Sequence, residues 1–192
     1  NTNGIDLALD GRLLNGEALT WSMGMVFSKY ATRVTELYDQ SRTTSIYGAN
    51  ILTQEDSPIG LFYGYQTDGI YASDTDAEAA GLLNRMSNED LIPFRGGDVI
   101  FIDGNSDGII DYKDMDVIGD PTPDFTGEIF SRIKYKGLSL DASLGFSYGG
   151  DVFNYQRYTL ENVSTTNNQT NSVINRWRYQ GQVTDIPRAK LN

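Results

Sequence analysis

The chain has 192 residues and a formal net charge of −11, and it contains neither cysteine nor histidine. So acidic a chain offers no basic patch that would neutralise phosphates, which excludes nucleic acid as a partner. The two missing residue types exclude disulfides, thiolate metal sites and histidine-dependent catalytic triads, while 12 tyrosines and 20 glycines favour a β-rich fold.

Residues 3–33 are predicted to form a first β-hairpin. Ile5, Leu7 and Leu9 alternate with polar or small residues, which is the period of two expected of a strand with one apolar face. Asn15-Gly16 is a strong turn signal, and each arm is about 10 residues or slightly longer. The apolar face of the return arm is predicted to carry Leu19, Trp21, Met23, Met25 and Phe27.

A long segment, 34–124, separates this hairpin from the next pair of strands. A structureless loop of that length is uncommon in a compact domain, so the segment is expected to hold structure of its own. Ser73 as N-cap, with Asp76 three residues later, predicts a short helix over 73–86. The β-branched and aromatic run Asp98-Val99-Ile100-Phe101-Ile102 predicts a strand.

Residues 103–114 have the spacing of a calcium-binding loop. Oxygen-bearing side chains recur at positions one, three, five, nine and twelve, and Gly108 stands at position six, where such a loop turns sharply. Because a hard cation takes about six to eight oxygen ligands, this pattern predicts Ca²⁺ as the cofactor. Ile110, at position eight, is expected to point into apolar packing. The predicted ligands are the side chains of Asp103, Asn105, Asp107 and Asp114, the main-chain carbonyl of Ile109, and Asp111 either directly or through water.

The sequence around this loop differs from that of a true EF-hand. A predicted strand precedes the loop, and about one helical turn follows it before Gly119 and Pro121. The role of the metal is therefore expected to be structural. Position twelve is aspartate instead of the usual bidentate glutamate, which predicts modest affinity. The alternative interpretation is a surface turn, since Asp, Asn and Gly all favour turns.

Residues 125–149 are predicted to form a second hairpin. Mostly apolar residues occupy every second position from Ile129 to Tyr148, on both sides of a Lys136-Gly137 turn. The remaining segment, 150–192, is polar and is predicted to be loop.

The strand pattern fits two architectures. In an outer-membrane barrel the apolar face meets lipid and the polar face lines a wet interior, whereas in a soluble β-sandwich the apolar face meets a second sheet. The length of the arms favours the barrel, because a strand that spans a membrane needs about 9–11 residues. The two tight turns and two long segments also favour it, because barrels combine short periplasmic turns with long outer loops. The soluble alternative is a calcium-stabilised β-sandwich that binds carbohydrate.

A series of short motifs runs through nearly the whole chain, each weak singly but specific together and in this order. Through them the chain resembles the SusC/RagA-type TonB-dependent outer-membrane transporters, although it has Asn105-Ser106-Asp107-Gly108 where that family more often has Asn-Gly-Asp-Gly. The motifs outside the loop are Gly64-Tyr65-Gln66-Thr67-Asp68-Gly69-Ile70, Gly97-Asp98, Ile118-Gly119-Asp120-Pro121-Thr122-Pro123, Phe125-Thr126-Gly127, Tyr135-Lys136-Gly137, Gly149-Gly150-Asp151-Val152-Phe153-Asn154, Asn175-Arg176-Trp177 and Thr184-Asp185-Ile186-Pro187-Arg188.

The resemblance implies an all-β fold, with antiparallel hairpins from a transmembrane β-barrel of about 22 strands and a long extracellular loop that carries the EF-hand-like calcium loop. The hairpins 3–33 and 125–149 would belong to the barrel. The segments 34–124 and 150–192 would be extracellular, on the outer membrane of a Gram-negative bacterium. The plug, the TonB-contacting segment and the final strands of that family have no counterpart in this chain.

The resemblance also implies a function. The family imports glycans or peptides with energy delivered through TonB, and a SusD-like surface lipoprotein closes the outer mouth as a lid. The chain is not expected to be an enzyme. Gly145-Phe146-Ser147-Tyr148-Gly149 matches the nucleophile-elbow pattern, but the strand that carries it is not expected to lead into a helix, and the chain has no histidine to act as base.

Overall fold

A computed structural model describes residues 1–86, 90–165 and 167–190. Residues 87–89 of the segment 34–124, and residues 166 and 191–192 of the segment 150–192, lie outside the described residues. The chain divides into two compact units. Unit 1 comprises Asn1–Thr44, Ile51–Phe62 and Gly119–Val152, and unit 2 comprises Ser45–Asn50, Tyr63–Ile118 and Phe153–Asn192.

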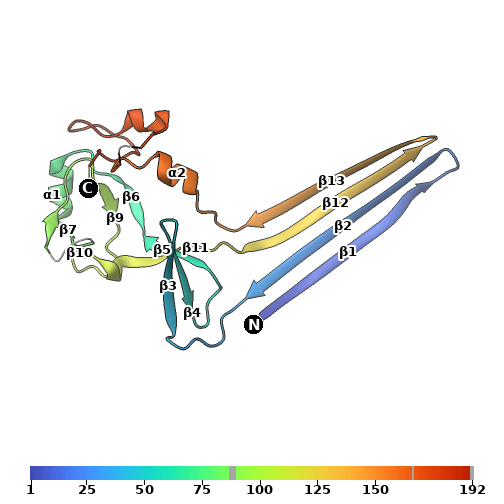
Figure 1. Cartoon of the computed structure of the whole chain (residues 1–192), viewed down its shortest axis with the longest axis horizontal. Helices are drawn as coiled ribbons and strands as arrows, with labels where there is room; N and C mark the ends of the chain where they lie inside the picture. Colours follow the sequence, from blue (N-terminus) through green and yellow to red (C-terminus); the bar gives the residue numbers. More distant parts are fainter. Residues whose placement is uncertain (87–89, 166, 191–192) are drawn as a thin grey trace. The chain divides into compact units, whose positions relative to one another are not determined.

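Unit 1 is built on a four-stranded antiparallel sheet. Its strands follow the order β1-β2-β12-β13 and lie side by side in Figure 1. The two hairpins predicted from the alternation are therefore present, and β2 pairs directly with β12 although about 90 residues of chain lie between them. The bounds are β1 Thr2–Asn15, β2 Leu19–Thr32, β12 Pro123–Tyr135 and β13 Leu138–Gly149.

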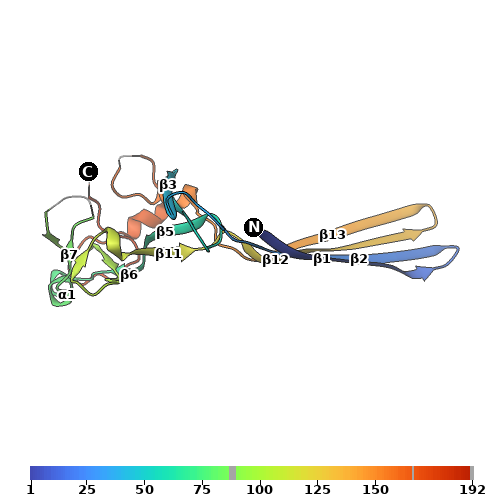
Figure 2. The same cartoon turned by 90° about the horizontal axis from the view of Figure 1, so that it is seen from below.

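Both hairpin turns lie at the same end of this sheet, as Figures 1 and 2 show. At the first turn the Gly16 N–H donates to the Leu19 carbonyl over 2.9 Å. At the second turn Lys136 adopts a positive φ of 52°, and its N–H donates to the carbonyl of Ala18 over 2.9 Å. The long segment between β2 and β12 leaves and returns at the opposite end.

The sheet has one apolar and one polar face, because the side chains of each strand alternate. One cross-strand row of the apolar face consists of Leu9, Met25, Ile129 and Leu144, and the next row, on the polar face, consists of Asp10, Gly24, Phe130 and Ser143. Figure 2 shows the four strands from the side as a single twisted layer.

Shorter strands follow β2 along the chain. They are β3 Ser41–Ile46, β4 Ala49–Gln54 and β5 Leu61–Tyr65. Within unit 1, β4 and β5 pair antiparallel through Ile51 with Phe62 and Leu52 with Leu61, and both leucines are buried.

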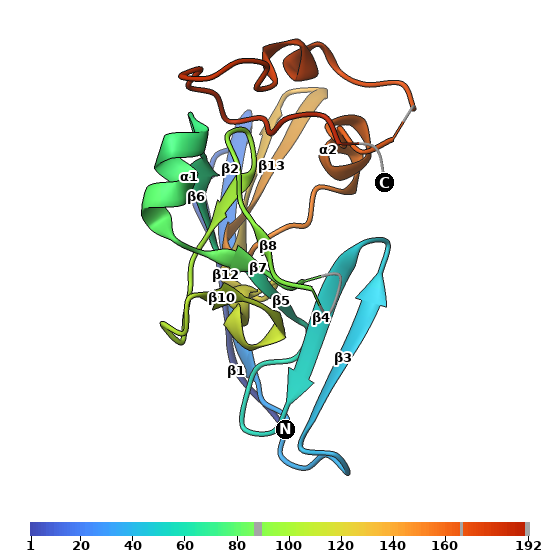
Figure 3. The same cartoon turned by 90° about the vertical axis from the view of Figure 1, so that its left-hand side faces the viewer.

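Unit 2 combines short strands with short helices, shown in Figure 3. The predicted strand at 98–102 is β9, Val99–Phe101, which pairs antiparallel with β6, Thr67–Ile70. The predicted helix is α1, Asp74–Ala80, with Ser73 as N-cap; it ends earlier than expected because Gly81 takes the left-handed C-cap conformation. The other short elements are β7 Leu83–Asn84, β8 Ile92–Pro93, β10 Ile109–Ile110, the 3₁₀ turn Tyr112–Asp114 and β11 Met115–Gly119.

A small apolar core holds unit 2 together. Tyr71, Ala77, Phe94 and Ile110 are its buried members, and Tyr65, Leu82, Met86, Ile100 and Phe101 pack around them half-buried. The elements that carry these residues are too short to be stable alone, so packing around this core must supply most of their stability.

The C-terminal segment contains two short helices where the sequence predicted loop. These are α2, Tyr155–Leu160, and a 3₁₀ helix, Asn171–Asn175. Asn154 caps α2 by accepting the N–H of Arg157 over 2.8 Å, so an asparagine interpreted as a loop residue in fact starts a helix. Among the described residues, no helix is sufficiently long and apolar to cross a membrane.

Candidate functional site

The predicted calcium loop, 103–114, lies in unit 2 between β9 and β11. Its first half is a tight turn in which Ser106 and Gly108 take positive φ values of 59° and 80°. The glycine at position six is thus where the chain turns sharply, as predicted from the loop pattern.

The first three predicted ligands hold this turn through main-chain N–H groups. The Asp103 carboxylate accepts from Gly108 over 2.8 Å and from Asp107 over 3.3 Å. The Asn105 side-chain oxygen accepts the Asp107 N–H over 2.9 Å, and one Asp107 oxygen accepts from Ile109 over 2.9 Å. The other Asp107 oxygen accepts the Asn105 side-chain amide over 3.0 Å. These side chains therefore shape the loop through hydrogen bonds within it.

Asp114 closes the loop from its other end. One of its oxygens accepts the Gly104 N–H over 3.1 Å, and the other accepts the Asp111 N–H over 2.8 Å. The side chain is buried, and its two bonds join the beginning of the loop to its last turn.

The carboxylate of Asp111 is held by two neighbours, Arg85 and Lys113. One carboxylate oxygen pairs with the guanidinium of Arg85, and the other accepts the Lys113 N–H over 2.9 Å. The hydrogen bond from Arg85, and to a smaller extent that from Lys113, holds the pKa of Asp111 below its usual range. The residue is 2% exposed, so the ion pair satisfies a carboxylate that has almost no access to water.

Ile110 anchors the loop in the core of unit 2, which confirms the apolar packing predicted for position eight. Its exposed fraction is 0%, and it packs with Tyr71, Ala77 and Phe94. The short parallel pairing of β10 with β7, Ile109 with Leu83 and Ile110 with Asn84, fixes this part of the loop in place.

The donor set fits calcium by its chemistry, because every predicted ligand offers oxygen. However, in the part of the chain that the structure describes, no three acidic, histidine or cysteine side chains converge as a cluster that would hold a metal ion. All of the predicted ligands belong to the loop 103–114, but the carboxylate of Asp111 is paired with Arg85. No pattern in the sequence indicated Arg85, which is 26 residues away from Asp111 along the chain.

A second set of contacts attaches the C-terminal segment to the rest of unit 2. Arg188 binds both oxygens of Asp98, over 2.8 and 3.0 Å, and its N–H donates to the carbonyl of Gly97 over 2.9 Å. The indole of Trp177 donates to the Ala72 carbonyl over 3.0 Å and lies so close to Gly97 that a Cβ there would approach its ring to 2.6 Å. Four of the residues in these contacts belong to the motifs noted in the sequence: Gly97, Asp98, Trp177 and Arg188.

A hollow of about 840 Å³ lies on unit 2 between β6, β9 and α2. Four aromatic rings line it, and its two charged side chains, Arg157 and Glu161, pair with each other over 2.7 Å. The lining of the hollow is thus rich in aromatic rings and carries no net charge. The four rings are those of Tyr65, Phe101, Phe153 and Tyr158.

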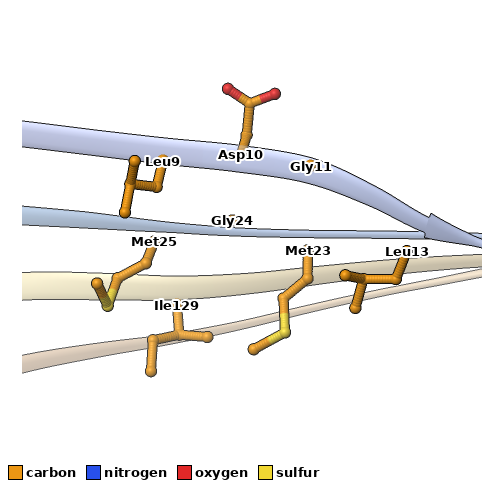
Figure 4. A pocket seen from close by; sticks show the side chains of 8 residues that line it. All are labelled: Leu9, Asp10, Gly11, Leu13, Met23, Gly24, Met25 and Ile129. Atoms are coloured by element: carbon orange, nitrogen blue, oxygen red, sulfur yellow. The ribbon is translucent and has the colours of Figure 1, made fainter.

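The apolar face of unit 1 is a candidate contact surface. Figure 4 shows Leu9, Leu13, Met23, Met25 and Ile129 projecting from one side of the sheet, and Asp10 from the other. These apolar side chains surround a shallow hollow of about 280 Å³. A large uncovered apolar surface marks a place where a protein meets another protein or a membrane.

Comparison with known proteins gives the class to which the chain is related. No family model matches it. It is 29% identical to TonB-dependent receptor P3 of Formosa agariphila, over 96% of the chain and 18% of that receptor. It is 22% identical to TonB-dependent receptor P39 of the same organism, over 98% of the chain and 21% of that receptor. The chain is therefore a relative of the TonB-dependent receptors and spans about a fifth of their length.

The structural comparison concerns the fold. A chain of the RagAB peptide transporter matches with a TM-score of 0.64 and 20% identity, over 98% of this chain and 20% of that one. The match is one of fold, and together with the relatives it is consistent with a segment of the SusC/RagA type, which confirms the family that the motifs indicated. These relatives are receptors and transporters and not enzymes, in agreement with the expectation for this chain.

Proposed function

We propose that this chain is part of a TonB-dependent importer in the outer membrane of a Gram-negative bacterium, and that its four long strands form part of the wall of a transmembrane β-barrel. The observation that carries the proposal is the uncovered apolar face of unit 1. Large side chains on this face are highly exposed among the described residues, including Ile5 at 71%, Leu140 at 63% and Leu144 at 66%. In a barrel this face would lie against lipid.

Strand length and pairing support this proposal. The strands have 14, 14, 13 and 12 residues, and a tilted strand needs about 9–11 to span a bilayer. The outer edges of β1 and β13 pair with no strand that the structure describes. Open edges are unstable in lipid, so the barrel must be closed by strands from parts of the protein outside this chain.

The arrangement of the turns suggests the orientation. Barrels of this kind have short periplasmic turns and long outer loops. We therefore assign the two tight turns to the periplasmic side and the segments 34–124 and 150–192 to the cell exterior. The proposed partners are TonB, which would act through a plug outside this chain, and a SusD-like surface lipoprotein that would cover the outer mouth.

The proposed cargo is an oligosaccharide or a peptide. The name of the RagAB peptide transporter supports a peptide. The aromatic hollow of unit 2 is a suitable place for either, because aromatic rings stack on sugar rings and on apolar side chains alike, and the Arg157–Glu161 pair leaves no net charge to repel a ligand.

We also propose that the loop 103–114 binds Ca²⁺. The side chains of Asp103, Asn105, Asp107 and Asp114 and the carbonyl of Ile109 would hold the ion, and Asp111 would act directly or through water. Once bound, the ion would supply a cross-link between the two halves of the loop. Ordering a long outer segment is entropically costly, and such a cross-link offsets part of that cost.

The absence of cysteine permits a direct test of the barrel. In the intact protein in outer-membrane vesicles, Leu144→Cys is expected to react with a lipid-soluble thiol reagent and to resist a water-soluble maleimide. Ser143→Cys, one residue earlier on the polar face, is the matched control and should react with the maleimide instead. If Leu144→Cys resists both reagents, its side chain lies in a protein core and the soluble sandwich is the better account.

The calcium proposal has a separate test. Chelation should leave the long strands intact but increase proteolytic cleavage within residues 95–120 several-fold, and added Ca²⁺ should reverse this. Equal cleavage with chelator and with Ca²⁺ would count against a structural metal.

A further inference from the structure

Arg85 holds two consecutive residues of the loop 103–114. Its N–H donates to the carbonyl of Ile110 over 3.0 Å, and its guanidinium donates to the carboxylate of Asp111. The main-chain bond continues the parallel pairing of β7 with β10, which begins at Leu83 and Ile109. The same short ladder therefore fixes both the backbone of Arg85 and the place from which its side chain reaches Asp111.

Both oxygens of the Asp111 carboxylate accept hydrogen bonds, and one of the two donors is a cation. Asp111 is 2% exposed, and its second oxygen accepts the Lys113 N–H over 2.9 Å. A guanidinium is charged at every accessible pH, so it is a permanent counter-ion for this carboxylate. A divalent cation on the same carboxylate would lie against the guanidinium and be repelled by its positive charge.

The charges of the loop indicate that its aspartates have different roles. The loop carries four aspartates, and two cationic side chains face them: Arg85 at Asp111, and Lys113, whose Nζ lies 3.9 Å from an oxygen of Asp107. Two negative charges remain in excess, which is the charge that one calcium ion neutralises. Asp103 and Asp114 have no such cationic partner among the described residues and so remain available to a metal.

We propose that Arg85 is a built-in cation of this loop. It takes the place of a metal at Asp111, so that Asp111 attaches the loop to β7 and does not bind Ca²⁺ directly. Arg85 is thus a positioning residue that keeps the second half of the loop folded with or without metal. Only the part that concerns the metal rests on the calcium site proposed above.

The first arm of the test measures calcium binding by titration calorimetry on the intact protein after removal of bound metal. Asp111→Asn is expected to keep the Kd for Ca²⁺ within about threefold of the wild type, whereas Asp103→Asn should weaken it at least tenfold. If Asp111→Asn weakens binding as much as Asp103→Asn does, Asp111 is a direct ligand and the proposal is overturned.

The second arm needs no metal and is done in chelator. Arg85→Gln should increase the rate of proteolytic cleavage within residues 103–114 at least tenfold, and Arg85→Lys, which keeps the charge, should restore most of the protection. Arg157→Gln is the matched control, since it removes an exposed ion pair elsewhere in unit 2, and it should leave this rate unchanged. Wild-type resistance in Arg85→Gln would overturn the role of Arg85.

A double variant separates a charge effect from general unfolding. Arg85→Gln combined with Asp111→Asn removes both charges, and protection should return toward the wild-type level because no lone carboxylate is then buried. If the double variant is cleaved as fast as Arg85→Gln, the ion pair is not the cause and the proposal fails. If the wild type binds no Ca²⁺ in the first arm, the metal assignment falls, while the role of Arg85 is still decided in chelator.

Discussion

The replacement Ile110→Ala tests whether the loop is anchored in the core of unit 2. Ile110 is the one loop residue inside the cluster of Tyr71, Ala77 and Phe94, with an exposed fraction of 0%. The change removes three carbon groups at about 0.8 kcal/mol each, or about 2.4 kcal/mol. The cavity left behind adds to this loss, so we expect unit 2 to lose about 4 kcal/mol, within the range of about 2–5 kcal/mol for such core changes.

Pulse proteolysis of the intact protein across a urea series measures this loss, with the fragments of unit 2 identified by mass spectrometry. A change of about 4 kcal/mol raises the opened fraction by nearly three powers of ten at a given urea concentration. The matched control is Ile174→Ala, whose side chain is 61% exposed and which should change stability by less than about 0.5 kcal/mol. A loss below about 1 kcal/mol for Ile110→Ala would refute the anchoring role.

Three other predictions follow from single contacts. The buried hydroxyl of Tyr71 has no partner among the described residues, so Tyr71→Phe should leave the stability of unit 2 unchanged or raise it by up to about 1 kcal/mol; a loss above about 2 kcal/mol in the same unfolding assay would contradict this. A Cβ at Gly24 would lie 2.2 Å from the Phe130 ring, so Gly24→Val should destabilise the sheet by about 1–3 kcal/mol. The folded fraction on a heat-modifiability gel should fall, and adding Phe130→Ala should restore it. A normal folded fraction in Gly24→Val would show that the sheet adjusts to the added side chain. The hydrogen bond from Arg157 lowers the pKa of Glu161, so this ion pair stabilises α2 at neutral pH. The stabilisation is lost as the pH falls below about 4.3, the ordinary value for glutamate, and through the lowered pKa of Glu161. Hydrogen exchange of α2 should show this loss in the wild type and not in Glu161→Gln, and identical pH profiles for the two proteins would contradict the prediction.

The sequence predicted those features that depend on local pattern. The period of two located the long strands, Ser73 with Asp76 located α1, and the position of Ile110 in the loop predicted its burial. Each of these signals is contained in a few consecutive residues, so no knowledge of distant contacts is needed to use it.

The features that depend on distant contacts were not predictable in this way. The pairing of Arg188 with Asp98 joins residues 90 positions apart, and strands of two residues such as β7 are too short to show any period. Arg85 was missed for the same reason, since nothing near it in the sequence indicates that its partner is Asp111. The candidate calcium ligands were proposed from spacing alone, which gives the donor type of each residue but not the direction in which its side chain points.

The adjacency of β2 and β12 has a consequence for how such a protein can vary. The intervening polypeptide departs from one strand and rejoins at its immediate neighbour, so it can be lengthened, shortened or exchanged without changing the order of the strands on either side. Loop closure becomes only slowly more costly with length, by about 0.6 kcal/mol per doubling. The segment between β2 and β12 can therefore vary in sequence and length while the four-stranded sheet stays constant, and a chimera that carries the corresponding segment of a related receptor should still assemble.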